Sequence, residues 1–171
     1  ILSRYDRLGA SSRLRTLQYV PSLQAQSREV IHAPFFDDQY LVDLYAGNRK
    51  ASRFISHLIG RLKHLKTGPR PDVIWLEKEA VPFLPWLFER ALLPRNIPII
   101  SDYDDAVFHR YDKHRSSLVR RFLGQKIDKV MAASRVVLAG NEYLAKRAQD
   151  AGAKRVEIVP TVVDLNHYRL P

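Results

Sequence analysis

The sequence predicts an α/β fold, a three-layer arrangement in which a mostly parallel sheet of about six or seven strands lies between two layers of helices. Two observations point to it. Short apolar runs of strand length alternate along the chain with longer segments whose apolar residues recur at helical spacing. At least one run, Ile97 to Ile100, is apolar throughout, which is typical of a strand buried on both faces of a parallel sheet.

Each element has a local signal. Six runs predict strands, over residues 1–3, 29–32, 72–76, 97–101, 136–139 and 156–159. Between them, helical spacing predicts helices over residues 12–19, 38–45, 49–66, 83–93, 116–133 and 141–151. Pro21 is expected to end the first helix, Asp38 to cap the second, and residues 68–69 (Gly-Pro) to end the third. Asn141 is expected to cap the last helix, and Gly152 to follow its end.

Composition excludes several classes of protein. With 171 residues and 46% hydrophobic residues, the chain can form one globular domain with a sizeable core. It has no cysteine, which excludes a disulfide framework and a thiolate metal site and fits a reducing cytosol. No apolar stretch is long enough to span a membrane, and no signal peptide is expected. Because the chain opens at Ile1 without Met and ends at Pro171 after a polar stretch, we expect it to be part of a longer protein.

The net charge of +10 is concentrated in two segments, residues 49–66 and 110–126. No acidic residue occurs between Asp43 and Asp72. Apolar residues recur at helical spacing in both segments, so each is expected to pack one face on the sheet and to show its cations to water. For the cations an anionic membrane surface is the expected partner. Nucleic acid would be attracted by the same charge, but the chain has no nucleic-acid motif and no aromatic residues interleaved with these cations.

Three carboxylates, Asp102, Asp104 and Asp105, follow the strand predicted at 97–101. Ligands of open α/β sheets bind beyond the carboxyl ends of the strands, so these acids are expected to hold a polar substrate. The alternative is a solvated turn in which an aspartate caps the next segment.

Other predicted strand ends carry further candidates. Gly9 lies between the first strand and helix, where a phosphate could be held, and Arg13 could support that phosphate or lie on the surface. The loop lacks the two-glycine dinucleotide motif and the Gly-Lys-Ser phosphate motif, so a simple turn remains an alternative. Glu77 and Glu79 could bind sugar hydroxyls, or Glu77 could pair with Lys78. The histidines are scattered, and no serine–histidine nucleophile or zinc motif is recognisable.

Four segments taken together resemble the N-terminal domain of group 1 glycosyltransferases (glycosyltransferase family 4). They are residues 9–13 (Gly-Ala-Ser-Ser-Arg), 72–77, 98–106 and 134–168, so the resemblance extends over nearly the whole chain. Two departures stand out. Members typically show Pro-Asn-Gly-Val-Asp where this chain has Pro-Thr-Val-Val-Asp at 160–164, and a frequent histidine of the family is replaced by Asp104.

The resemblance implies a GT-B enzyme, in which two Rossmann-like domains face each other across a cleft. Residues 1–171 would be the acceptor-side domain, and the donor-binding C-terminal domain is absent from this chain. The family transfers sugars from nucleotide sugars with retention of configuration and without an obligatory metal, so no cofactor and no metal site are expected. Asp104 and Asp105 would orient acceptor hydroxyls. The residues expected to bind substrate are Gly9, Ala10, Ser11, Arg13, Glu77, Glu79, Asp102 and Asn141.

Many relatives act on lipid-linked acceptors at the cytoplasmic face of the membrane, so we expect a cytoplasmic protein bound at the inner face of the plasma membrane. By itself the 171-residue chain is expected to be inactive. The main alternative is a stand-alone Rossmann-like module that binds a carbohydrate or nucleotide without transferring a sugar. A nucleic-acid-binding domain, suggested only by charge, is the more distant one.

Overall fold

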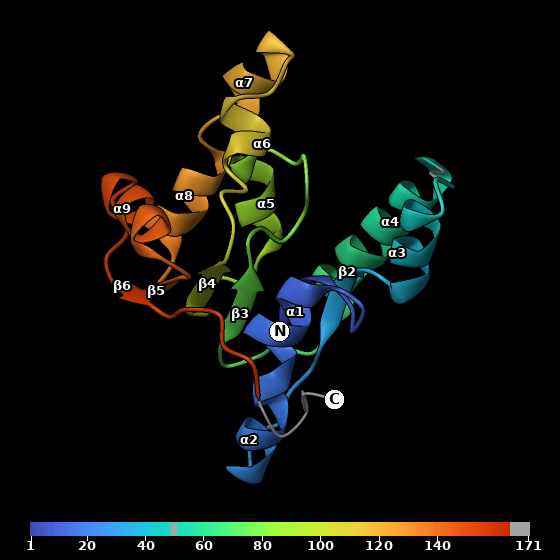
Figure 1. Ribbon diagram of the computed structural model, residues 1–171, viewed down its shortest axis with the longest axis vertical. Helices are drawn as coiled ribbons and strands as arrows, with labels where there is room; N and C mark the ends of the chain where they lie inside the picture. Colours follow the sequence, from blue (N-terminus) through green and yellow to red (C-terminus); the bar gives the residue numbers. More distant parts are fainter. Residues whose placement is uncertain (49–50, 165–171) are drawn as a thin grey trace.

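A computed structural model describes residues 1–48 and 51–164 and contains six parallel strands in one sheet, in the order β2-β1-β3-β4-β5-β6 (Figure 1). Every neighbouring pair of strands runs parallel. The α/β class and the parallel sheet predicted from the sequence are therefore confirmed, at six strands. The strands are β1 (Leu2–Tyr5), β2 (Ala33–Phe36), β3 (Ile74–Glu77), β4 (Ile99–Tyr103), β5 (Val136–Ala139) and β6 (Val156–Ile158).

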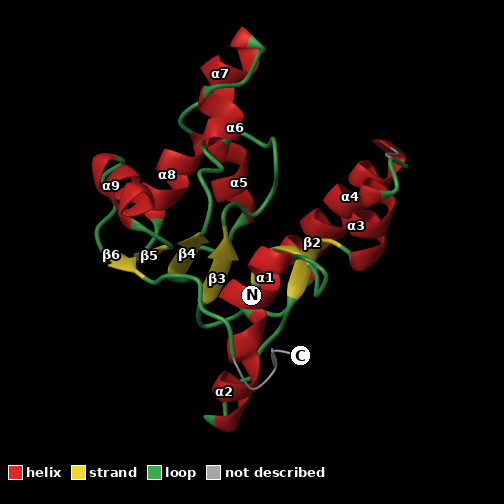
Figure 2. Ribbon diagram, in the orientation of Figure 1, coloured by secondary structure: helices red, strands yellow, loops and turns green. Residues whose placement is uncertain are grey.

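Helices lie on both faces of the sheet, and Figure 2 separates them by colour from the strands. They are α1 (Ala10–Arg15), the 3₁₀ helix η1 (Leu17–Tyr19), α2 (Val20–Ala25), α3 (Asp38–Tyr45), α4 (Ala51–Thr67), α5 (Trp86–Leu92), α6 (His109–Asp112), α7 (Ser117–Leu123), α8 (Lys126–Ala133) and α9 (Glu142–Asp150).

Alternation along the strands divides the sheet into two different faces. Ile74 and Leu76 of β3 belong to an apolar core cluster that packs against side chains of α4 and α5. Further along the same side, a second apolar cluster joins β4 and β5 to α8 and α9. Trp75 and Glu77 point to the opposite face, where Ser12 of α1 bonds the Glu77 carboxylate. The result is the three-layer, Rossmann-like arrangement that the sequence predicted.

Several predicted elements differ from the structure, and the helix predicted over 12–19 is α1 followed by η1. The second strand begins at Ala33, four residues later than predicted, and contains Pro34. Proline is tolerated there because β2 is an edge strand, which needs fewer ladder hydrogen bonds. Pro21 does not end a helix; it lies in the first turn of α2, where the missing N–H costs no hydrogen bond. The helix predicted over 116–133 is two helices, α7 and α8, separated at residues 124–125.

Two helix ends follow the predicted chemistry and one differs by a residue. Asn141 caps α9, its side chain accepting a hydrogen bond from the backbone N–H of Leu144, and Gly152 follows with a φ of 85°. The cap of α3 is Asp37, one residue before the predicted Asp38. Residues 49–50 of the first basic segment, and residues 165–168 of the last segment in the family resemblance, lie outside the described residues. Within the described residues, no helix is long and apolar enough to cross a membrane.

The helix layer is held together by ion pairs that are shielded from water. The Lys126 Nζ of α8 lies 2.9 Å from a Glu89 oxygen of α5 and 2.6 Å from a Glu79 oxygen beyond β3. Glu89 also accepts hydrogen bonds from the backbone N–H groups of Ala80 and Val81. All three side chains are buried, where an unpaired charge is costly, so Lys126 supplies the positive charge that Glu89 and Glu79 share.

We expect Lys126→Met to destabilise the chain by about 3–5 kcal/mol, because it leaves Glu79 and Glu89 buried with too little compensating charge. Urea unfolding followed by circular dichroism measures the loss. Lys129→Met, an exposed position of the same helix, is the control and should change the free energy of unfolding by less than about 0.5 kcal/mol. Equal stability of the two variants would contradict this role of Lys126.

Candidate functional site

The carboxyl ends of β1, β3, β4 and β5 lie next to one another, and most of the sequence-predicted site residues lie at or beside them. β3 and β4 are in register, with Glu77 beside Asp102. Beyond the strand ends, the N–H of Lys78 donates to the Asp102 carbonyl, and the N–H of Gly140 donates to the Tyr103 carbonyl. The backbone therefore aligns the residues that follow these strands along one edge of the sheet, where ligands of open α/β sheets bind.

Lys78 lies at the centre of this edge, although it was not among the site residues predicted from the sequence. Its side chain is 4% exposed, and its Nζ lies 3.0 Å from an Asp104 oxygen and 2.8 Å from an Asp105 oxygen. Its φ is 66°, in the left-handed region that residues other than glycine rarely adopt. Such strain persists only where surrounding contacts impose it, and it occurs often at functional sites. A lone cation between two glutamates at a predicted strand end was the available signal.

Asp104 is held ionised by two neighbours. Besides Lys78, the Ser11 hydroxyl of α1 donates to its second oxygen at 2.5 Å. Burial opposes ionisation, but Lys78 and the Ser11 hydrogen bond outweigh it and lower the pKa of Asp104. Burial also opposes the charge on Lys78, and Asp104 and Asp105 outweigh it and raise the Lys78 pKa. The side chain of Asp105 is 59% exposed, so this carboxylate is anchored at one end and open to solvent.

Glu77 lies on the α1 side of the sheet and does not pair with Lys78. One carboxylate oxygen accepts the Ser12 hydroxyl at 2.6 Å and the backbone N–H of Arg4 at 3.2 Å. The other oxygen is buried and has no hydrogen-bond partner among the described residues. Burial raises the pKa of Glu77, against the opposing effects of Lys78 and the Ser12 hydroxyl. A direct contact with sugar hydroxyls would require this enclosed carboxylate to become accessible.

Asp102 is part of β4 rather than of the loop after it. The strand was predicted to end at Ile100 or Ser101, but it continues through Tyr103, so Asp102 is buried beneath α1. Arg15 binds one Asp102 oxygen through two nitrogens at 2.7 and 2.9 Å, and Trp75 donates to the other at 3.3 Å. Burial nevertheless raises the pKa of Asp102. Arg15 also donates to the Val159 carbonyl, which ties the residues after β6 to α1.

Other side chains of the protein bind both carboxylate oxygens of Glu79. Its oxygens accept hydrogen bonds from Tyr111, at 2.7 and 2.9 Å, and from Lys126 at 2.6 Å. Arg4 of β1 adds an ion pair at 3.3 Å. Glu79 is buried, so these contacts link a strand end to the helix layer.

The remaining candidates lie around the cluster rather than in it. Gly9 precedes α1 with an ordinary φ of −70°, and a Cβ there would come 2.4 Å from the Cβ of Tyr5. Glycine is thus required by the approach of Tyr5. Ala10 is exposed, and the Arg13 guanidinium donates to the Arg7 carbonyl at 3.0 Å. Asn141 follows β5, where its side chain caps α9. Within residues 1–48 and 51–164, no group of acidic or histidine side chains is arranged to hold a metal ion.

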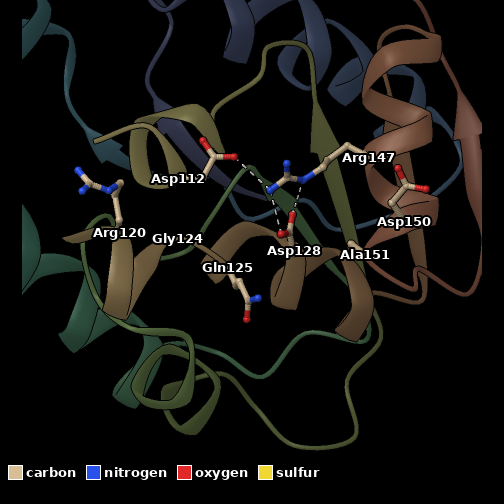
Figure 3. A pocket seen from close by; sticks show the side chains of 8 residues that line it. All are labelled: Asp112, Arg120, Gly124, Gln125, Asp128, Arg147, Asp150 and Ala151. Carbon is tan, nitrogen blue, oxygen red and sulfur yellow. Dashed lines mark hydrogen bonds and ion pairs between the residues drawn. The ribbon is translucent and has the colours of Figure 1, made fainter. Parts of the chain in front are cut away.

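A separate cavity of about 450 Å³ lies among the helices (Figure 3). Arg147 lies in it and bonds Asp128 at 2.7 and 2.9 Å and Asp112 at 3.2 Å. Its charged groups are thus largely paired with one another. The lining residues, none of which was a candidate from the sequence, are Asp112, Arg120, Gly124, Gln125, Asp128, Arg147, Asp150 and Ala151.

Comparison of the chain with known protein families, curated proteins and solved structures found no match.

Because Lys78 offsets the burial of Asp104, we expect Lys78→Met to raise the pKa of Asp104. Side-chain ¹³C NMR titration measures it. Lys113→Met, an exposed lysine elsewhere, is the control and should leave the Asp104 titration unchanged. Since folding lowers the pKa of Asp104 in the native sequence, its contribution to stability is present at neutral pH and is lost as the pH falls through the folded pKa. An Asp104 pKa that is the same in the Lys78→Met variant and in the native protein would refute the coupling.

Proposed function

We propose that the chain is the acceptor-binding half of a retaining glycosyltransferase of GT-B architecture. The full-length enzyme would move a sugar from a nucleotide sugar to a glycan or a lipid-linked acceptor in the synthesis of cell-envelope polysaccharide or glycolipid. The observation that carries the proposal is the cluster of Lys78, Asp104, Asp105 and Ser11 at the carboxyl edge of an all-parallel sheet. This edge is where α/β sheets bind polar ligands.

The chemistry of the cluster suits a sugar acceptor. A sugar presents several hydroxyl groups, and an ionised carboxylate accepts hydrogen bonds from two of them at once. The buried ammonium of Lys78 pairs with both Asp104 and Asp105, and it helps to lower the pKa of Asp104. Asp105 is open to solvent and would bind the acceptor, while Asp104, fixed by Lys78 and Ser11, would orient it. Both would align an acceptor hydroxyl, which is the contribution expected from this half of the enzyme.

The donor would be bound by a second domain that this chain does not contain. The departing nucleoside diphosphate accumulates negative charge, which cations and helix N-termini can stabilise in place of a metal ion. A lipid-linked acceptor would bring the protein to the inner face of the plasma membrane. The family resemblance supports the type of reaction, and the cluster of Lys78, Asp104, Asp105 and Ser11 (the acidic cluster) supports the binding of the acceptor.

The 171-residue chain alone should transfer no sugar, because the groups expected to bind the donor are not part of it. Incubation with a panel of radiolabelled nucleotide sugars and with glycan and lipid-linked acceptors tests this, with chromatography of the products. A labelled acceptor product formed by the isolated chain would overturn the division of labour between the two halves.

Binding of sugars to the chain should depend on Asp105. We expect Asp105→Asn, which keeps the size of the side chain and removes its charge, to weaken binding about tenfold or more, the value of a hydrogen bond to a charged group. Saturation-transfer NMR against a panel of mono- and oligosaccharides measures it. The control is Asp150→Asn, an exposed carboxylate on α9 paired with Lys146. If both variants bind the panel as the native chain does, or if the native chain binds no sugar, the acceptor assignment fails.

A further inference from the structure

Helix α7 carries two large apolar side chains that the fold leaves in water. Leu118 is 66% exposed and Phe122 is 67% exposed. They are four residues apart, so they lie on the same flank of the helix. The core-facing positions of α7 are Leu123, which is buried, and Val119, which packs against the same core cluster. The fold therefore uses one side of α7 and leaves an apolar flank uncovered.

Cations lie beside this apolar flank. Lys113, Arg115 and Arg121 are exposed. Arg120 is exposed too, but it is two residues from both Leu118 and Phe122 and so lies on the opposite side of α7, where it donates to the carbonyl oxygens of His114 and Arg115 at 2.6 and 3.1 Å and fastens the preceding loop to the helix. No acidic residue occurs between Asp112 and Asp128, so no negative side chain within this stretch of sequence opposes an anionic surface.

The position of α7 allows contact with an extended surface. It lies at the end of the molecule along its longest axis, beyond α5 and α6 and far from the sheet (Figure 1). A short helix at such a tip can touch a flat partner without obstruction from the rest of the fold.

The other basic segment is a weaker candidate for the same role. Helix α4 also exposes an apolar pair, Ile55 at 55% and Ile59 at 61%. However, Arg53 is paired with Asp43 of the neighbouring α3, and Arg61 is buried, where it donates to the Ser3 carbonyl. In the second segment, Lys126 is likewise buried and unable to reach a surface, so the exposed cations of that segment all lie within residues 110–121.

We infer that α7 and the loop before it form a lipid-binding surface, in which Leu118 and Phe122 enter the headgroup region of an anionic bilayer while Lys113, Arg115 and Arg121 contact lipid phosphates. Helices with an apolar flank and a cationic border bind at this depth. Each cation near an anionic bilayer strengthens binding about fivefold. The apolar pair favours a membrane over nucleic acid, because a nucleic-acid backbone would gain nothing from these side chains. This surface is distinct from the acidic cluster and requires no sugar chemistry.

Cosedimentation of the 171-residue chain with vesicles tests the inference, using phosphatidylcholine alone or mixed with phosphatidylglycerol. We expect binding to the mixed vesicles, weakened by salt, and little binding to phosphatidylcholine alone. Leu118→Ser with Phe122→Ser should lower the partition coefficient about tenfold or more. Arg115→Gln with Arg121→Gln should lower it about 30-fold. The matched control, Ile55→Ser with Ile59→Ser, removes an exposed apolar pair at the same spacing on α4 and should bind as the native chain does.

Circular dichroism and the thermal midpoint verify that each variant is folded. The inference is overturned if the variant with both α7 substitutions binds as the native chain does, or if the variant with both α4 substitutions loses more binding. It is also overturned if the native chain does not bind anionic vesicles. Salt-sensitive binding to duplex DNA without binding to vesicles would assign the cations to nucleic acid instead. The assay contains no sugar, so none of these outcomes bears on the proposed acceptor site, which the sugar-binding experiment tests separately.

Discussion

The structure depends on the end of β3, where three ionisable residues in succession, Glu77, Lys78 and Glu79, are buried. Glu77 is held by Ser12 on the α1 side of the sheet, and Glu79 by Arg4, Tyr111 and Lys126 toward the helix layer. Burying an ionisable side chain is costly unless it is hydrogen-bonded or paired, so the segment can be buried only because these contacts are made. The two anchored glutamates leave Lys78 little freedom between them, which accounts for its left-handed backbone and for its fixed position against Asp104.

The fold class could be predicted because strand and helix periodicities differ and each is repeated along the chain. Boundaries were harder where local chemistry has two meanings. Proline can end a helix or begin one, and Pro21 begins α2. Apolar residues recur at helical spacing throughout 116–133, yet the helix is interrupted at residues 124–125. The periodicity of apolar side chains does not reveal where one helix ends and the next begins. The fifth strand, a short apolar run between Arg135 and Gly140, has the predicted bounds.

The candidate site was predicted in outline and not in its arrangement. Position after a strand was enough to single out Asp104 and Asp105. It could not tell that Asp102 is still within the strand and bound by Arg15, a partner 87 residues away in sequence. Nor could position after a strand reveal that buried side chains bind both oxygens of Glu79. Such pairings are made across the sheet, and one sequence contains no record of which strands are neighbours. Lys78 was overlooked for the same reason, since its partners follow the next strand along the chain.

The two borders of the sheet have a consequence for how the protein behaves at high concentration. An exposed strand edge offers unpaired backbone groups to another copy, which is a common route to aggregation. Here one border is β2, where Pro34 removes a donor, and the other is β6, which has three residues and an exposed Glu157. Neither border is a good template for strand addition. The two edge strands therefore need no second subunit to cover them, and self-association through these borders of the sheet should be disfavoured.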